Sequence, residues 1–140
     1  MCNNNENNSC ENCIQDILKV ILLLQQNVCK NDTCLATCDR GFLGQSSLAL
    51  SNTRPIVLYT YATGSTPLAM PISKDPTVTD TSTVFRLEKL DGCCATCRVL
   101  TPNTDETSTY PYVATNSFFT INLNCVCVLR CLDDTYVDTP

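Results

Sequence analysis

The chain has 140 residues and a net charge of −5, and it contains 12 cysteines but neither histidine nor tryptophan. Without histidine, Ser-His-Asp and Cys-His catalysis are excluded, and zinc is restricted to all-cysteine or cysteine-carboxylate sites. The nine Lys and Arg residues form no basic run, which argues against nucleic-acid binding, because that affinity rests on contacts to phosphate. The length predicts one domain with its own core, and the cysteine content is typical of a disulfide scaffold.

Residues 1–12 are rich in asparagine and poor in apolar side chains, which predicts a disordered arm carrying Cys2 and Cys10. No positively charged signal region precedes the first apolar run, and Gln25 and Gln26 interrupt that run before it is long enough to span a bilayer. We therefore expect no membrane span and synthesis in a reducing cytosol. The cysteine content is that of a secreted protein, and a compartment that becomes oxidising later would resolve this conflict.

An apolar stripe predicts a helix over residues 13–28. The stripe has the spacing of one helix face and consists of Ile14, Ile17, Ile21, Leu24 and Val28. Two interpretations are open: the helix packs only on its own domain, or it also contacts a neighbouring subunit. Three apolar residues outside the stripe favour the subunit contact: Val20, Leu22 and Leu23.

Residues 13–140 are predicted to form a single domain, with a cysteine-rich connector (29–54) after the helix and an acidic tail (133–140). Residues 55–132 combine apolar alternation with turn signals, which predicts antiparallel strands. The predicted strands are 55–61, 67–73, 83–90, 94–100, 110–115 and 118–132, of which the last is one long strand or two strands joined at a bend. The expected fold class is mainly β: an antiparallel, sandwich-like domain preceded by one N-terminal α-helix and the disordered arm.

The dipeptide Asp91-Gly92 predicts a hairpin between two of these strands. A three-residue loop, 91–93, places the apolar side chains on one face and the charged side chains on the other. The apolar face then holds Phe85, Leu87, Ala95, Cys97 and Val99, and the other face holds Arg86, Glu88, Thr96 and Arg98. This register predicts that Cys97 points inward, that Cys94 points outward and that Cys93 lies in the turn.

Three chemistries compete for the cysteines. The pairs Cys10/Cys13 and Cys94/Cys97 have the C-x-x-C spacing of zinc ligands, but they lie far apart, and positions i and i+3 of a strand face opposite ways. Cys10-Glu-Asn-Cys13 lies at a helix start as a redox pair does, but Glu11 opposes a thiolate there and no βαβ pattern surrounds it. Structural cross-linking is therefore favoured. We expect no enzymatic activity, no metal and no cofactor, since catalytic motifs are also lacking.

The cross-linking interpretation divides the cysteines by predicted position. Those on the arm, in the connector and at the hairpin tip are candidates for intermolecular disulfides: Cys2, Cys10, Cys29, Cys34, Cys38, Cys93 and Cys94. The others are candidates for burial or for pairing within the chain: Cys13, Cys97, Cys125, Cys127 and Cys131. Cys125, Cys127 and Cys131 share one parity with Phe119, Ile121 and Leu123 in an extended strand, which favours a buried row over a metal site.

Four segments resemble the CotY/CotZ/ExsY family of spore-coat and exosporium proteins of Bacillus and its relatives. They are FLG (42–44), NTRPIVLYT (52–60), VFRLEKLDGCCATCRVL (84–100) and TINLNCVCVLRCL (120–132), and Cys13 to Gln26 fits the helix of that family, which begins with a cysteine. The resemblance carries over to individual cysteines: Cys13, Cys34, Cys38, Cys93, Cys94, Cys125, Cys127 and Cys131.

The resemblance implies a non-enzymatic structural protein that is synthesised in the mother-cell cytoplasm and located at the spore surface, in the outer coat or exosporium. Such proteins assemble with themselves, as hexamers that tile into two-dimensional sheets, and with other coat proteins, and disulfides stabilise the sheets. Synthesis in a reducing cytosol, followed by oxidation on the released spore, would explain why a protein made in the cytosol has the cysteine content of a secreted one. The alternative function is a cysteine-rich zinc-binding module without enzymatic activity.

Overall fold

The computed structural model describes residues 13–26 and 51–138. One helix, α1 (Cys13–Gln26), precedes seven strands and a short 3-10 helix: β1 (Ile56–Thr60), β2 (Met70–Pro71), β3 (Thr81–Ser82), β4 (Val84–Asp91), β5 (Cys94–Pro102), β6 (Tyr112–Asn122), η1 (Leu123–Cys125) and β7 (Val126–Cys131). The predicted arm and most of the predicted connector, with Val28, lie outside the described residues.

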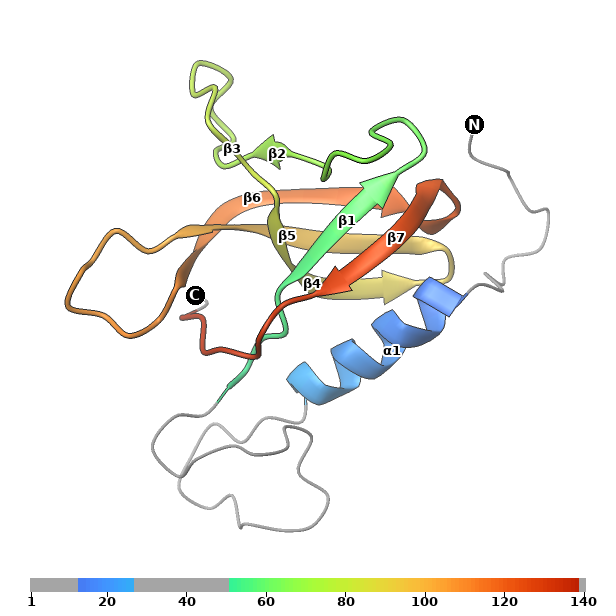
Figure 1. Ribbon diagram of the computed structural model, residues 1–140, viewed down its shortest axis with the longest axis horizontal. Coiled ribbons are helices and arrows are strands. Elements are labelled where there is room, and N and C mark those ends of the chain that lie inside the picture. Colours follow the sequence, from blue (N-terminus) through green and yellow to red (C-terminus); the bar gives the residue numbers. More distant parts are fainter. Residues whose placement is uncertain (1–12, 27–50, 139–140) are drawn as a thin grey trace, which may run out of the picture.

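Five of the strands form one sheet in the order β6-β5-β4-β1-β7, and β2 and β3 form a separate two-stranded ribbon. Every pairing is antiparallel, so the prediction of a mainly β, antiparallel fold with one N-terminal helix is confirmed. The sheet is covered by α1, which lies against β4 and β7, and the second layer is thus a helix and not a second large sheet (Figure 1).

The core lies between α1 and the sheet. Phe85 of β4 is fully buried and meets Phe119 of β6 edge to face, with ring centroids 4.7 Å apart, a geometry that aromatic pairs prefer. The other fully or almost fully buried apolar residues of this cluster are Ile14, Leu18, Ile21, Ile56, Leu58, Leu87, Ala95, Cys97, Val99, Leu123 and Val126. Apolar residues before and within the β2–β3 ribbon pack against the same cluster: Leu68, Met70 and Ile72.

The helix stripe predicted from the sequence does not form a single face. Ile14 and Ile21 are buried together with Leu18, whereas Ile17 is 47% exposed and Leu24 is only half-buried. The difference arises because the prediction used the spacing of a coiled-coil seam, whereas this helix buries the residues that an ordinary 3.6-residue repeat brings to one side. A second apolar face therefore remains exposed, and contact between α1 and a neighbouring subunit stays a prediction.

The β4–β5 hairpin has the predicted faces but not the predicted loop. Leu87 lies opposite Cys97 and Phe85 lies opposite Val99, as expected, but Asp91 already pairs with Cys94, which leaves a two-residue loop. Gly92 takes φ +57° in this loop, a conformation that costs glycine little. Glu88 absorbs the difference of one residue, because it is the extra residue of a β-bulge between Leu87 and Lys89.

The bulge places Glu88 between two arginines that are direct cross-strand partners, Arg86 and Arg98. Its carboxylate is 2.9 Å from Arg86 Nη1 and 3.1 Å from Arg98 Nε. Arg98 also donates to the carbonyl of Thr115 at 2.8 Å, and its guanidinium lies 4.3 Å from the centre of the Phe118 ring. Two like charges that would repel each other across the hairpin are thus held together by the carboxylate between them.

Gln25 connects the end of α1 to the sheet. The side chain is buried; its Nε2 donates to the carbonyl of Leu87 at 2.8 Å, and its Oε1 accepts from the backbone N–H of Arg54 at 3.1 Å. Leu87 is the residue just before the Glu88 bulge, where the β4 ladder is interrupted. One amide therefore satisfies two backbone groups, one on β4 and one in the segment just before β1.

Candidate functional site: the exposed thiols

Five cysteines of the described part of the chain are free thiols: Cys13, Cys94, Cys97, Cys127 and Cys131. Cys97 is buried, and the other four are exposed. Cys93 and Cys125 are not among the free thiols, because both are disulfide-bonded. In this structure Cys93 therefore has no free thiol for the intermolecular bond that the sequence predicts for it. The described cysteines other than Cys97 form two groups, one around the tip of the β4–β5 hairpin and one along β7. Cys97 lies in the core.

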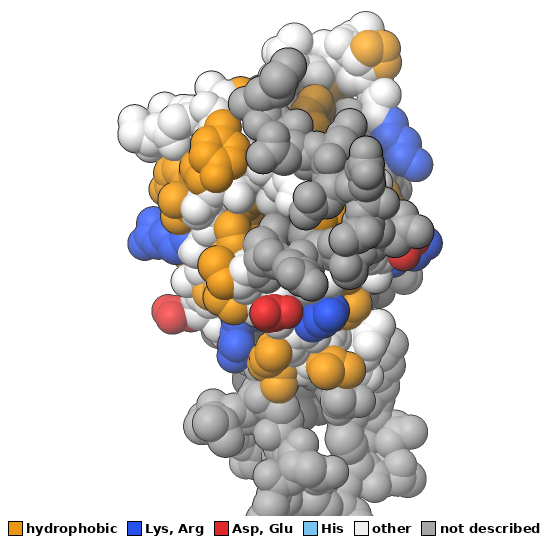
Figure 2. Space-filling view, turned by 90° about the vertical axis from the view of Figure 1, so that its right-hand side faces the viewer, with side chains coloured by type: hydrophobic (Ala, Val, Ile, Leu, Met, Phe, Trp, Pro, Cys, Tyr) orange, Lys and Arg blue, Asp and Glu red, His pale blue; other side chains and the backbone are white. Residues whose placement is uncertain are grey.

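The first place, here called the hairpin corner, consists of Cys13, Cys93, Cys94 and Cys125. It joins three elements: the backbone N–H of Leu123 in η1 donates to the carbonyl of Cys93 at 2.8 Å, and Gln15 Nε2 of α1 lies 3.4 Å from the carbonyl of Gly92. Cys94 points outward at the start of β5, as the hairpin register predicts, and Cys13 begins α1. Figure 2 shows the side of the molecule on which α1 begins, where hydrophobic side chains lie among isolated charges.

The second place is β7, where Cys127 and Cys131 are exposed. Like Cys13, which is exposed and free at the start of α1, they contradict the prediction that they are buried or paired within the chain. On β7 the reason is that η1 divides the predicted long strand, so that β6 and β7 become the two opposite edges of the sheet. Val126 still points into the core, with 5% exposure, but the strand then continues along the rim.

Cys127 is the extra residue of a second β-bulge. Tyr59 of β1 pairs with Val128 and Thr60 pairs with Val126, so Cys127 has no residue opposite it in its own sheet. Its thiol lies 3.4 Å from the carbonyl oxygen of Tyr59, to which it donates. A bulge re-aims the side chain it carries and is frequent at sheet edges, and here it leaves a thiol at the rim.

Cys131 ends β7 beside an ion pair. Arg54 Nε and Asp134 Oδ1 are 2.7 Å apart, and the three groups act on one another electrostatically. Partial burial and the negative charge of Asp134 raise the pKa of the Cys131 thiol, while the positive charge of Arg54 opposes that rise. The thiol is therefore more protonated at neutral pH than an ordinary cysteine, which slows its oxidation, since the thiolate is the reactive form.

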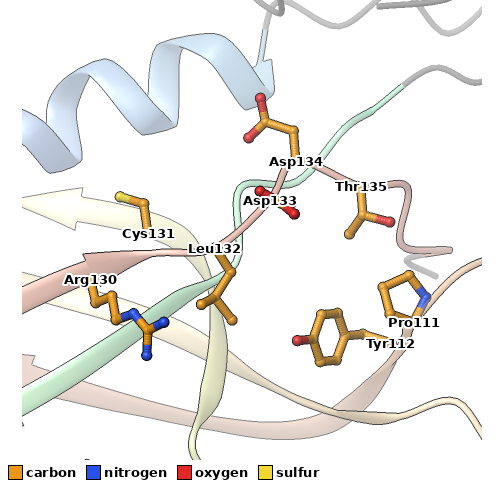
Figure 3. Close-up of a pocket in the computed structure, with 8 residues that line it drawn as sticks. All are labelled: Pro111, Tyr112, Arg130, Cys131, Leu132, Asp133, Asp134 and Thr135. Atoms are coloured by element: carbon orange, nitrogen blue, oxygen red, sulfur yellow. The ribbon is translucent and has the colours of Figure 1, made fainter.

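An open hollow of about 530 Å³ lies next to this end of β7 (Figure 3). It is lined by Pro111, Tyr112, Arg130, Cys131, Leu132, Asp133, Asp134 and Thr135. Figure 3 shows the side chains of Arg130 and Cys131 pointing to opposite sides of β7, as strand alternation requires. Arg130 and Cys131 therefore present a charge and a thiol on different faces of the same edge strand.

Cys97 belongs to the core and not to the reactive set. It is fully buried, and burial, followed by the negative charge of Glu88, raises the pKa of its thiol to about 12. Cys94 is thus exposed to solvent and Cys97 lies in the core, as expected for positions i and i+3 of a strand. Within residues 13–26 and 51–138, no three or more cysteine or carboxylate side chains are grouped so that they could hold a metal ion.

We expect Cys97 to resist alkylation in the folded protein. At pH 8 a maleimide should label Cys94 and Cys127 within minutes and Cys131 more slowly, because the pKa of Cys131 is raised. Cys97 should react only after a denaturant is added, because it is both buried and protonated. Peptide mass spectrometry after stepwise labelling measures this order. Labelling of Cys97 at the rate of Cys94 in native buffer would contradict the burial described here.

The fold and its thiols define a small, cysteine-rich antiparallel β domain. The sequence model of the spore coat protein Z family matches residues 1–112, which include α1 and the strands β1 to β5. The chain therefore belongs to the spore coat protein Z family, in agreement with the resemblance seen in its motifs. No curated protein and no solved structure matches the chain.

Family membership implies a structural role in the spore coat and a place at the spore surface. No helix in the described residues is long and apolar enough to cross a membrane.

Proposed function

We propose that this protein assembles with itself, as hexamers that tile into a two-dimensional lattice, in the outer coat or exosporium of the spore, and that intermolecular disulfides stabilise the lattice. The observation that carries the proposal is the placement of the free thiols. Cys13 and Cys94 are exposed at the hairpin corner, and Cys127 and Cys131 are exposed on the edge strand β7. One subunit thus offers thiols at two separate places, which a covalent network needs and a closed dimer does not.

The domain does not depend on these exposed thiols for its core. Its buried cluster consists of apolar side chains from α1 and the sheet, and Cys97 is the one fully buried free thiol of the described residues. The exposed face of α1 supports a noncovalent subunit contact as well, since Ile17, Val20 and Leu23 are 47%, 55% and 57% exposed. Apolar surface of this kind marks contact sites, and the predicted role of α1 in subunit contacts becomes part of the proposal.

The proposal also covers the compartment in which the protein assembles and the proteins with which it assembles. Assembly begins in the mother-cell cytoplasm, where thiols stay reduced, and cross-linking follows when the surroundings become oxidising. The partners are further copies of the chain and other coat or exosporium proteins. The cysteines that lie outside the described residues, Cys2, Cys10, Cys29, Cys34 and Cys38, keep their place as candidates for intermolecular bonds, and no enzymatic activity, metal or cofactor is part of the proposal.

Electron microscopy of the purified protein tests the proposal directly. We expect ordered two-dimensional arrays, and after treatment with oxidised glutathione a ladder of multimers on non-reducing gels that collapses to monomer on reduction. Protein whose thiols were alkylated beforehand is the control and should show no ladder. Protein that stays monomeric by both measurements, or that retains stoichiometric zinc after desalting, would count against a disulfide lattice and favour the zinc-binding alternative.

A further inference from the structure

β7 is an edge strand with little protection against pairing. It bonds to β1 on one side, and in the described residues no strand pairs with its other side. Native edges are usually guarded by lysine, proline or inward-pointing charge, but the six residues of β7, VCVLRC, contain Arg130 as their one charge and no proline. Val128 leaves an apolar side chain 48% exposed on this strand. Such an edge is suited to accept another extended strand.

The sequence of β7 is symmetric in its cysteines. Cys127 and Cys131 lie at equal distances on either side of Leu129. If a second β7 runs antiparallel along the first with Leu129 on the two-fold axis, Cys127 of each strand lies opposite Cys131 of the other. Opposite Cα atoms in such a pair are about 4.5–5.5 Å apart, which is within the range that a disulfide spans.

We propose that a second copy of this chain adds its β7 to the free edge of β7 about a two-fold axis at Leu129, and that two disulfides join Cys127 of each subunit to Cys131 of its partner. The inference rests on the proposed function, because it assigns one contact of the lattice. A two-fold contact alone closes a dimer, but in combination with a ring-forming contact it joins neighbouring rings into a sheet.

The chemistry of each cross-link is a simple oxidation. The thiols of Cys127 and of the partner's Cys131 lose two protons and two electrons and form one S–S bond. A disulfide of low molecular weight, such as oxidised glutathione, accepts them and is reduced to two thiols. Both thiols are free and exposed, and Cys127 has no opposite residue in its own sheet. Within one strand the two cysteines are about 13 Å apart, at roughly 3.3 Å per residue, so a bond between them must join two chains.

Peptide mapping tests the pairing, because trypsin cleaves after Arg130 and so separates Cys131 from Cys127. Equal amounts of ¹⁵N-labelled and unlabelled protein are mixed while reduced, oxidised with glutathione disulfide and digested. We expect a linked peptide that joins residues 99–130 to residues 131–140 and carries mixed isotopes. It should be lost in Cys127→Ser, which separates it from a bond to Cys125, and kept in Cys94→Ser. Arrays and ladders without this peptide would overturn the β7 contact and leave the lattice standing, whereas loss of arrays, ladders and peptide together would overturn both.

The register is tested by two substitutions at one exposed position. The two-fold pairing places Val128 opposite Arg130 of the partner subunit, twice per contact. Val128→Lys therefore sets like charges against each other, whereas Val128→Glu sets opposite charges together, and both replace the same side chain with a polar one. Trypsin also cleaves after the new lysine, so the linked peptide of Val128→Lys joins residues 99–128 to residues 131–140. We expect about tenfold more linked peptide from Val128→Glu than from Val128→Lys at low salt, and a smaller ratio in 1 M salt. Equal yields from two variants with unchanged circular dichroism would overturn this register, as would pairing of β7 with β6 of another copy.

Discussion

Gln25→Met is expected to lower the free energy of unfolding by about 2–4 kcal/mol. The substitution keeps the length and the helix propensity of the side chain but removes the buried amide that bonds to Leu87 and Arg54 at 2.8 and 3.1 Å. A buried backbone group that loses its hydrogen bond costs about 1–3 kcal/mol, and two groups are affected. Chemical denaturation followed by circular dichroism measures the change, with the slope against denaturant checked for constancy.

Gln26→Met is the matched control. It makes the same chemical change one residue later, at an exposed position of the same helix, and should alter stability by less than about 0.5 kcal/mol. If both variants were equally stable, the Gln25 amide would not be what fastens α1 to β4 and to the segment before β1.

The second large effect is expected for Glu88→Gln, which should cost about 2–4 kcal/mol of stability. The amide has the shape of the carboxylate but no charge, so Arg86 and Arg98 face each other across the hairpin without the group that bridges them. Removing one member of a buried ion pair costs about 3–5 kcal/mol; the effect is smaller here because the Glu88 side chain is 22% exposed. Thermal and urea unfolding measure the loss.

Two comparisons identify the cause of this loss. Glu106→Gln removes a carboxylate from an exposed loop and should leave stability nearly unchanged. Adding 0.5 M salt should recover part of the loss in Glu88→Gln, because salt screens the repulsion between the arginines. A double variant that also carries Arg86→Met should lose less than the sum of its single changes; strict additivity would mean that the three charges do not act together.

The sequence predicts the faces of the hairpin better than its connections. Alternation correctly places Phe85 and Cys97 inside, because each strand must bury one side. The apolar and polar residues that mark the two sides are adjacent in the sequence. The loop length was wrong because a bulge at Glu88 shifts the register by one residue without changing which side faces the core. Bulges depend on how a whole sheet twists, and nothing in the local pattern around Glu88 marks one.

Alternation alone does not predict which of the free thiols are exposed. The bend that separates β6 from β7 has a local signal, since Asn122 accepts a hydrogen bond from the backbone N–H of Asn124 at 2.9 Å, a turn that asparagine favours. What the sequence does not reveal is that the two strands then lie at opposite edges of the sheet. Parity correctly sends Leu123 inward, but exposure at Cys127 and Cys131 depends on strand order, which is a long-range property.

The strand order also determines when the sheet can be completed as the chain is synthesised. β1 lies between β4 and β7, and Ile56 of β1 pairs with Cys131 of β7 across most of the domain sequence. β7 is synthesised after every other strand of the sheet. As the chain leaves the ribosome, one side of β1 therefore stays unpaired until β7 has been made. Long-range pairings of this kind form late. The strand proposed to join subunits is thus also the strand that completes the subunit, so a nascent chain lacks the edge proposed for this contact until its own sheet is finished.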